Sequence, residues 1–229
     1  MSRRRTGRLR RGRQRDQLVD GQVVVRMLPV PAGDDPSARR VQRTRDLLRA
    51  SLFALIREQG YDALSVQDII DRANVGRATF YAHFSNKDEL LLCGFDVLRE
   101  ELKQLQRDAA HARDPEGRLF AFSHHIFAHV APYRPVYYAM AKERGGAAVR
   151  QHLQRLLVDC SKAELKRLHG GRPARELDAL TQFFAGAFVG LLSWWLEARA
   201  PMAVDEIDQL FRRLAIPALA AAGQAQSAA

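Results

Sequence analysis

The sequence is poor in the residues that build disulfide frameworks and cysteine-ligated metal centres. Only two cysteines, Cys93 and Cys160, occur in 229 residues, and their spacing matches neither a zinc motif nor a disulfide pattern. Both lie in apolar, helix-like segments, so we expect reduced core residues in a cytoplasmic protein. These numbers exclude a small disulfide-stapled domain.

Long apolar runs are scarce as well. The longest runs from Phe183 to Leu196 and has fourteen residues, whereas a membrane-spanning helix needs about 20. The arginine-rich start leads into no apolar segment of the kind found in a signal peptide. We therefore expect a buried helix at 183–196 and no membrane partner.

Motifs for enzymatic chemistry are missing too. We find no nucleophile elbow, no phosphate-binding loop and no plausible spaced carboxylate pair, so we do not expect an enzyme. His124, His125 and His129 invite a metal interpretation, because positions 125 and 129 share a helix face. No cysteine or HExxH-like glutamate completes a site there, and polar rim or pocket residues are the simpler interpretation. We expect no metal and no cofactor.

Charge is plentiful and unbalanced. Lysine and arginine total 36 against 26 acidic residues, a net charge of +10, which favours polyanionic partners. Nine arginines fall before residue 39, in a stretch without helical periodicity, so residues 1–38 are predicted to be a disordered basic tail. This tail is either an arm that adds non-specific DNA affinity or an inert extension, with Met27 as an alternative start.

The rest of the chain has helical periodicity, and no stretch alternates with period two long enough for a strand. Proline and glycine punctuate it, and Pro217 should bend or end the last helix. The pattern predicts an all-α fold of about nine helices: a helix-turn-helix domain at 39–86, a helical bundle at 87–222 and a disordered tail at 223–229. The expected helices span 38–59, a short stretch from the Ser65 cap to Ala73, 77–84, 86–112, 116–130, 135–144, 147–169, 174–199 and 204–221.

The most informative segment is Leu64 to Lys87, LSVQDIIDRANVGRATFYAHFSNK. Ser65 and Asp68 fit a capping box at the start of a short helix. Asn74 stands where a left-handed turn residue is needed, a conformation that Asn tolerates. Gly76 opens the next helix without a capping side chain. The segment therefore predicts helix, tight turn and helix.

The second of these helices carries side chains suited to a DNA groove. Arg77 can bond guanine with two parallel hydrogen bonds, Ala78 permits close approach, and Thr79 and Tyr81 can bond bases or phosphates. Ser85 and Asp88 repeat the capping pattern for a third helix. Lys87 lies in the positively polarised first turn of that helix, which suggests a nearby anion. Each residue alone also fits an ordinary surface or packing role.

The segment resembles the DNA-binding domain of the TetR family of transcriptional regulators over about residues 40–92. The matching positions are Ile69-Ile70, Asn74-Val75, Thr79-Phe80-Tyr81, His83-Phe84 and Lys87. Asn74 departs from the family's usual Gly, and Gly76 from its common capping Ser. The resemblance implies base contacts from Gln67, Arg77, Ala78, Thr79 and Tyr81, and phosphate contacts from Ser65, Thr79, Tyr81, His83 and Lys87.

The resemblance also implies a body that dimerises and binds a small effector. Gly186 and Gly190, four residues apart in an apolar helix, would let helices approach closely. We expect a two-fold dimer through 174–199 and 204–221, although these helices could instead be buried in one subunit. Aromatic residues are the candidates for an effector pocket, with core packing as the alternative. The pocket candidates retained are Phe127, Tyr137, Tyr138, Phe184 and Trp194.

These observations favour a repressor that a small molecule releases from a palindromic operator. An architectural protein that coats DNA without sequence preference is the alternative, and the arginine-rich tail is its best support.

Overall fold

The computed structural model describes residues 36–109, 119–168, 171–199 and 201–224, and the described chain contains helices and no strand. The predicted all-α fold is therefore confirmed. The basic tail predicted at 1–38 lies outside the described residues except for 36–38, which begin the first helix. The predicted tail at 223–229 likewise lies outside them apart from 223 and 224, which end the last helix.

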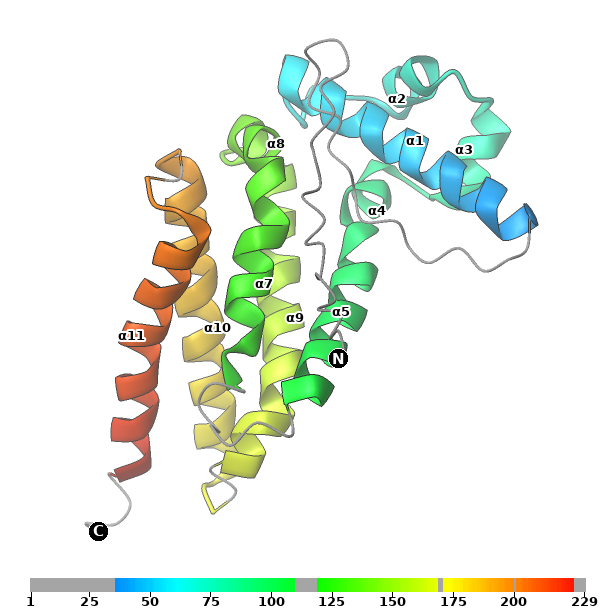
Figure 1. The fold of residues 1–229 in the computed structure, drawn as a ribbon. Helices are drawn as coiled ribbons and strands as arrows, with labels where there is room; N and C mark the ends of the chain where they lie inside the picture. The colour runs from blue at the N-terminus through cyan, green and yellow to red at the C-terminus, as the bar shows by residue number, and fades with distance from the viewer. Residues whose placement is uncertain (1–35, 110–118, 169–170, 200, 225–229) are drawn as a thin grey trace, which may run out of the picture.

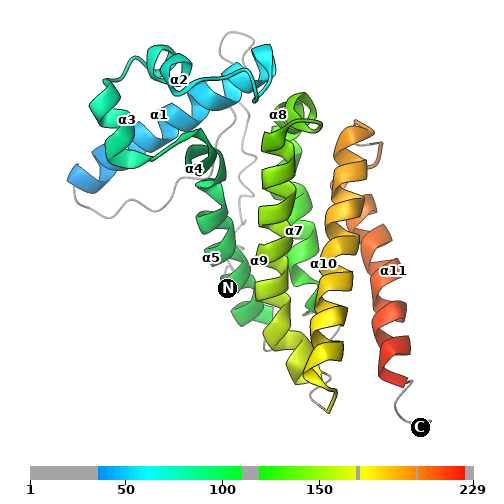
Figure 2. The same cartoon turned by 180° about the vertical axis from the view of Figure 1, so that it is seen from behind.

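Three helices form a compact head at one end of the molecule (Figure 1). They are α1 (Pro36–Gln59), α2 (Val66–Ala73) and α3 (Arg77–His83), and α4 (Lys87–Leu92) leads out of the head. The remaining elements, which we call the body, run side by side beneath the head in both views (Figure 2). They are α5 (Gly94–Ala109), α7 (Ala121–Val130), η1 (Ala131–Tyr133), α8 (Arg134–Met140), α9 (Arg144–Leu168), α10 (Ala174–Glu197) and α11 (Val204–Gln224).

Local signals set the boundaries of the head helices. The capping box is present: the Ser65 side chain accepts from the Asp68 backbone N–H, and the Asp68 carboxylate accepts from Ser65 N–H. Asn74 has φ 49° and ψ 48°, the left-handed turn that the sequence predicts. Gly60, at φ 80°, ends α1. Gly76 precedes α3 without a side-chain cap, as expected.

The prediction that Ser85 and Asp88 cap the third helix is wrong by one residue. Asn86 caps α4, and its side chain accepts from Glu89 N–H at 2.8 Å. The Glu89 carboxylate reaches back to Ser85 N–H at 2.7 Å. Asp88 is engaged elsewhere because it accepts from the hydroxyl of the buried Tyr61.

The single helix predicted at 86–112 is two helices that meet at Cys93. Glycine at position 94 allows a close approach there, since a Cβ on Gly94 would lie 3.4 Å from Arg49 Nη1. Two other glycines are also placed by contact rather than by a turn. Gly145 and Gly146 lie inside the first turn of α9, where added Cβ atoms would meet the Tyr61 ring at 2.6 Å and the Met140 carbonyl at 2.4 Å.

The last helix, predicted at 204–221 with Pro217 bending or ending it, does not end at Pro217 and runs to Gln224. Pro217 and Arg213, whose carbonyl loses its helical partner, both lie on an exposed side of α11, where water can bond that carbonyl.

Interlocking aromatic rings fill the body between α7, α10 and α11. The rings of Phe188 and Phe211 lie 5.0 Å apart edge to face, and Phe127 contacts both Phe188 and Trp195. Beside them, buried Asp208 on α11 bonds the Ser123 hydroxyl and accepts from Arg212 Nε at 3.0 Å. These contacts fix α7 against α11.

One face of α10 packs along α9, and the other face is apolar and exposed. Phe183 is 60% exposed and Trp194 is 46% exposed. Between them lie Gly186 and Gly190, where an added Cβ would meet nothing within 4 Å. By length and composition alone α10 is the one described helix that could cross a membrane. The helix predicted to be buried is therefore buried on one side only.

Candidate functional site

The short helix α3 presents a small polar face to solvent. Arg77, Ala78 and Tyr81 are exposed, and Thr79 is half-buried. Phe80 and Phe84 point the other way into the core, at 0% and 2% exposure. The two rings hold a helix of only seven residues in place, because so short a helix is not stable by itself. The predicted base-contacting residues thus share one accessible surface.

Gln67 of α2 lies beside this surface. Arg77 Nη1 donates to Gln67 Oε1 at 3.4 Å, and the Arg77 guanidinium lies 5.6 Å from the centre of the Tyr81 ring. Gln67 in turn donates to Asp71 at 2.8 Å. These weak, exposed contacts align the three side chains. Each side chain can give up its contact with the others and bond a base edge or a phosphate at little cost in free energy.

Lys87, predicted as a phosphate contact, lies against protein groups at the start of α4. Its Nζ donates to the carbonyl oxygens of Tyr61 at 2.9 Å and Leu64 at 2.6 Å, and lies 4.5 Å from the centre of the Tyr61 ring. Two carbonyl dipoles and an aromatic face therefore stabilise the positive charge of this lysine at the helix start. Lys87 holds the loop between α1 and α2 onto the start of α4.

The other predicted phosphate contacts lie near the edges of the α3 surface. Ser65 is exposed, and its hydroxyl is engaged with Asp68 at 2.6 Å. His83, at the end of α3, is half-buried beside the Phe84 ring. Neither position conflicts with a phosphate contact.

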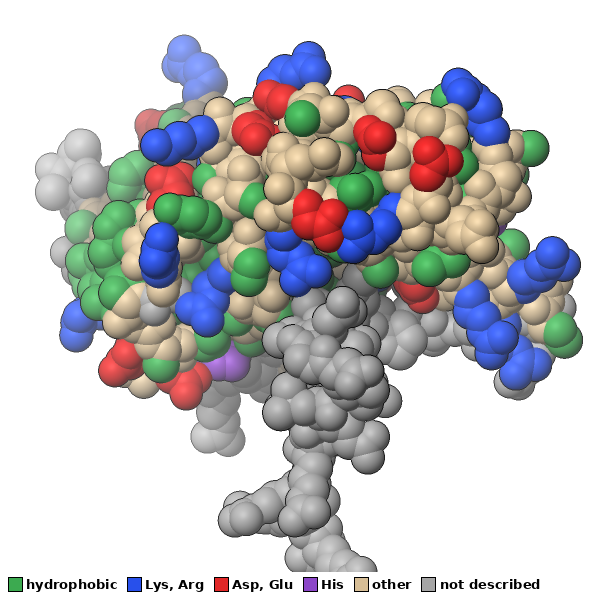
Figure 3. All heavy atoms as spheres, turned by 90° about the horizontal axis from the view of Figure 1, so that it is seen from above, with side chains coloured by type: hydrophobic (Ala, Val, Ile, Leu, Met, Phe, Trp, Pro, Cys, Tyr) green, Lys and Arg blue, Asp and Glu red, His purple; other side chains and the backbone are tan. Residues whose placement is uncertain are grey.

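The first turns of α1 add positive charge next to α3. Arg39, Arg40 and Arg43 are exposed, and the Arg45 guanidinium lies 4.7 Å from the centre of the Phe84 ring. Seen from above, basic side chains gather at the end of the head where α1 begins, whereas acidic side chains lie nearer the middle (Figure 3). Exposed positive charge therefore lies beside α3, at the start of α1.

A tight joint connects the head to the body at the end of α1. The Glu143 carboxylate accepts from the backbone N–H groups of Tyr61 and Asp62, the latter at 2.9 Å. Gly60 lies so close that a Cβ there would be 2.3 Å from Glu143 Oε1. Burial and the hydrogen bond to Asp88 raise the pKa of Tyr61, so its hydroxyl stays protonated.

An apolar cavity of about 140 Å³ lies beneath the head. Two of its walls come from the head helix α1, through Arg49 and Phe53, and from α4, which leads out of the head, through Leu91. The remaining wall residues come from the body: Gly94, Phe95, Val97, Leu98, His129, Val130, Tyr133, Val136, Tyr137, Met140, Val149, Arg150, Leu153, Val189, Leu192, Ser193 and Leu196.

Few polar groups reach this cavity. On one side the Tyr137 hydroxyl donates to Ser193 Oγ at 3.1 Å and accepts from Arg150 Nη1 at 3.3 Å. On another, burial lowers the pKa of His129, as do the nearby His125 and Arg49, whereas Glu101 acts in the opposite direction. A mostly apolar lining with a few convergent polar groups is typical of a small-molecule site.

Of the five residues predicted from sequence to bind an effector, Tyr137 lies on the wall of this cavity. Phe127 and Phe184 are in the aromatic core, 0% and 3% exposed, with their rings packed on other phenylalanines. Tyr138 and Trp194 are on the surface, 53% and 46% exposed. The cavity is lined mainly by aliphatic residues, which an aromatic pattern could not reveal.

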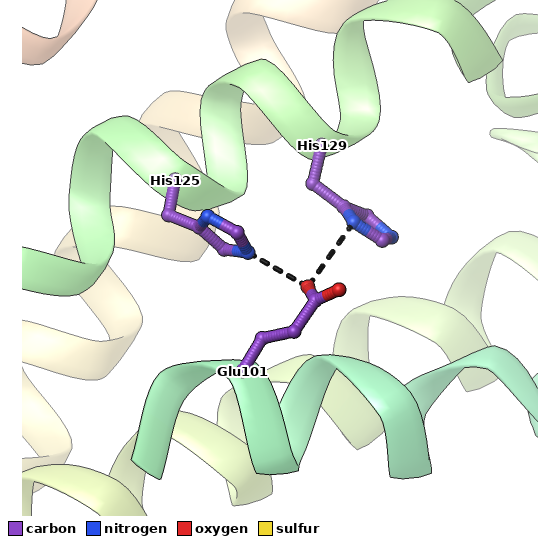
Figure 4. Close-up of side chains that lie close together, drawn as sticks. All are labelled: Glu101, His125 and His129. Carbon is purple, nitrogen blue, oxygen red and sulfur yellow. Dashed lines mark hydrogen bonds and ion pairs between the residues drawn. The ribbon is translucent and has the colours of Figure 1, made fainter. Parts of the chain in front are cut away.

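The structure also brings together a group that the sequence did not show. His125 and His129 of α7 both point at Glu101 of α5, 24 residues earlier in the chain (Figure 4). Spacing along α7 finds the two histidines, but only the packing of α5 on α7 supplies the carboxylate. His124, in contrast, faces α11 and pairs with Asp205 at 2.9 Å.

Known sequences and structures resemble this chain in both parts. The regulator YxbF of Bacillus subtilis is 48% identical over 54 residues, which is 23% of this chain and 14% of YxbF. Matches to curated relatives cover 14% to 39% of their lengths. A TetR-family regulator from Syntrophomonas wolfei shares the fold with a TM-score of 0.63 at 16% identity, over 78% of this chain and 96% of that one. The Thermus thermophilus repressor FadR, solved with lauroyl-CoA, does so at 0.52 and 20%, over 75% and 93%.

Two family profiles match consecutive parts of the chain. The profile for bacterial regulatory proteins of the tetR family matches residues 48–92, which run from the second half of α1 to the end of α4. A profile for the C-terminal region of transcriptional regulators matches residues 118–216 in the body. Together they cover more than half of the sequence. The chain is therefore a helix-turn-helix transcriptional regulator of the TetR family, a family of non-enzymatic proteins.

Proposed function

We propose that this regulator is a homodimeric repressor, released from a palindromic operator when a small molecule fills the cavity beneath the head. One observation carries the proposal: the cavity is walled by α1 and α4 as well as by the body. A bound molecule would thus touch the helices that hold and orient α3. Acting on bacterial DNA, such a repressor works in the cytoplasm.

On the DNA, α3 enters the major groove and presents Arg77, Ala78, Thr79 and Tyr81 to base edges. Gln67 reads from the start of α2, since its amide already lies within hydrogen-bonding distance of Arg77. Ser65, His83 and the exposed arginines of α1 contact the flanking phosphates. Lys87 supports this surface from inside the head rather than through a phosphate.

Dimerisation places two such heads one helical turn of DNA apart, as a palindromic site requires. The exposed stripe of α10, with Phe183 and Trp194 flanking two glycines, suits self-complementary helix packing. Leu214 of the neighbouring α11 is a second exposed apolar side chain, at 62%. Covering this surface with a second copy removes it from water.

The size of the cavity indicates the class of effector. An apolar cavity of about 150 Å³ in another protein is large enough for benzene, and this one measures about 140 Å³. The best candidate is therefore a single-ring or similarly small apolar molecule. A hydroxyl or carboxylate on it would meet Arg150, Tyr137 and Ser193, which already bond one another on the wall.

The DNA half of the proposal is tested by selecting bound duplexes from a random pool with the full-length protein. A repressor enriches one palindrome, and unrelated duplex competes poorly with it. Equal binding to all duplexes would instead establish the architectural, DNA-coating function.

The effector half is tested by screening single-ring aromatic compounds for binding by ligand-detected NMR. Val149→Phe fills the cavity from α9 and should abolish binding. Val204→Phe makes the same exchange on α11, away from the cavity wall, and should leave binding intact. Compounds that bind both variants equally would place the effector site elsewhere.

A further inference from the structure

Three potential metal ligands converge between α5 and α7. Glu101 Oε2 lies 2.7 Å from His125 Nε2 and 3.8 Å from His129 Nδ1. The donor atoms of all three residues lie within 4.8 Å of one another. Figure 4 shows both imidazoles directed from consecutive turns of α7 toward the one carboxylate. Among the described residues no other group of three or more such side chains meets this spacing.

The spacing fits a divalent transition metal ion. Four donors arranged tetrahedrally about 2.0–2.1 Å from zinc lie about 3.3 Å from one another. The two distances from the carboxylate oxygen, 2.7 and 3.8 Å, bracket this value. Small rotations of the side chains therefore suffice to place an ion between them. Two imidazoles and one carboxylate form a donor set that zinc sites use when they keep a fourth position open.

The surroundings favour ion binding over an ordinary surface cluster. The side chains of Glu101, His125 and His129 are 25%, 29% and 21% exposed, so an ion can enter but is largely shielded from water. The residues come from two different helices that already pack together. His129 also forms part of the cavity wall, so the cluster adjoins the cavity.

We propose that Glu101, His125 and His129 bind one divalent transition metal ion, with zinc as the best fit, which clamps α5 to α7. The ion takes the carboxylate oxygen of Glu101, Nε2 of His125 and Nδ1 of His129, and water completes its coordination. This site goes beyond the repressor function proposed above and does not depend on it. Because α5 follows directly after α4, which leads out of the head, the bound ion would hold this connection against α7 of the body.

The site is tested by titrating the full-length, metal-free protein with Zn²⁺ in a calorimeter and with Co²⁺ in a spectrophotometer. One ion per chain is expected, with the visible bands of Co²⁺ in low-symmetry nitrogen and oxygen coordination and no thiolate charge-transfer band. Zn²⁺ should also raise the Tm. Glu101→Gln, His125→Gln and His129→Gln should each weaken binding at least about tenfold, since even indirect metal partners contribute that much.

His124→Gln is the matched control. It removes an adjacent histidine that pairs with Asp205 and faces away from the cluster, so Zn²⁺ affinity should not change. Each glutamine can still hydrogen bond, and circular dichroism of the metal-free variants checks that they fold. The proposal is overturned if folded wild-type protein does not bind Zn²⁺, if binding survives all three substitutions unchanged, or if Cys93→Ser abolishes it.

Discussion

The head and the body of this regulator differ in how their functional surfaces are assembled. In the head, the surface on α3 is built from residues 65–84, and caps, a left-handed turn and two buried rings within that stretch position it. In the body, the cavity is assembled from residues between 49 and 196, which come together only when seven helices and η1 pack. The surface proposed to read DNA is thus built locally, whereas the cavity proposed to bind the effector is built from distant parts of the chain. The joint between them decides whether one can control the other.

The largest expected effect tests that joint. Gly60→Ala should lower the free energy of unfolding by about 3 kcal/mol, because alanine is strained at φ 80° and displaces the Glu143 carboxylate from two backbone N–H groups. Urea denaturation measures it. Gly171→Ala, where a Cβ meets nothing within 4 Å, is the control. A loss as small as that of the control would show that the joint is loose.

Next in size is the effect of the base-contacting surface on DNA affinity alone. Arg77→Ala should weaken operator binding by about 1–3 kcal/mol and relax discrimination at particular base pairs. Its stability should change by less than about 0.5 kcal/mol, because the side chain is exposed. Fluorescence anisotropy against the selected operator and single-base variants measures this. Arg175→Ala on α10 removes the same charge far from the head and serves as the control. If it weakened operator binding equally, the effect of Arg77→Ala would be due to net charge alone.

A smaller effect shows whether Lys87 supports the fold of the head or contacts a DNA phosphate. Lys87→Met should destabilise the protein by about 1–2 kcal/mol, since two carbonyl oxygens lose their donor. The dependence of operator affinity on salt should keep its slope, because no phosphate contact is lost. Lys103→Met, at an exposed surface pair on α5, is the control. A slope reduced by about one would restore Lys87 as a phosphate ligand.

The smallest effect concerns the uncapped start of α3. Gly76→Ser should stabilise the protein by a few tenths of a kcal/mol, since Ser can bond a free N–H of the first turn. A Cβ at Gly76 meets only Thr79 Oγ1, at 3.7 Å, so no clash opposes the gain. Thermal denaturation detects the shift. Destabilisation would mean that α3 needs the freedom of glycine at its start.

Prediction from the sequence succeeded where a short stretch decides the outcome. The Ser65 cap, the left-handed Asn74 and the uncapped Gly76 follow from the backbone needs of neighbouring residues. The assignment of Ser85 and Asp88 failed because Tyr61, 27 residues before Asp88, takes that carboxylate. The two carbonyl groups that accept from Lys87 were not predicted, because no sequence rule shows them converging on it.

In the body the helices were predictable and their contacts were not. Gly145 and Gly146 look like a turn in the sequence, but they lie inside α9. Both positions require glycine because Tyr61 and Met140 leave no room for a Cβ. Phe184 and Phe127 were placed in a pocket because aromatic residues serve both cores and pockets, and only packing separates these uses. Glu101 was not linked to the histidines of α7 because nothing in their spacing points to α5.

The most direct test of the account is the affinity of the protein for its selected operator, measured by anisotropy with and without a single-ring compound that binds the cavity. Filling the cavity should weaken operator binding by about 5- to 150-fold, the usual range of coupling between two sites. Val149→Phe should remove this response to the compound, and Val204→Phe should retain it. A compound that occupies the cavity and leaves operator affinity unchanged would contradict the claim that the cavity controls the head.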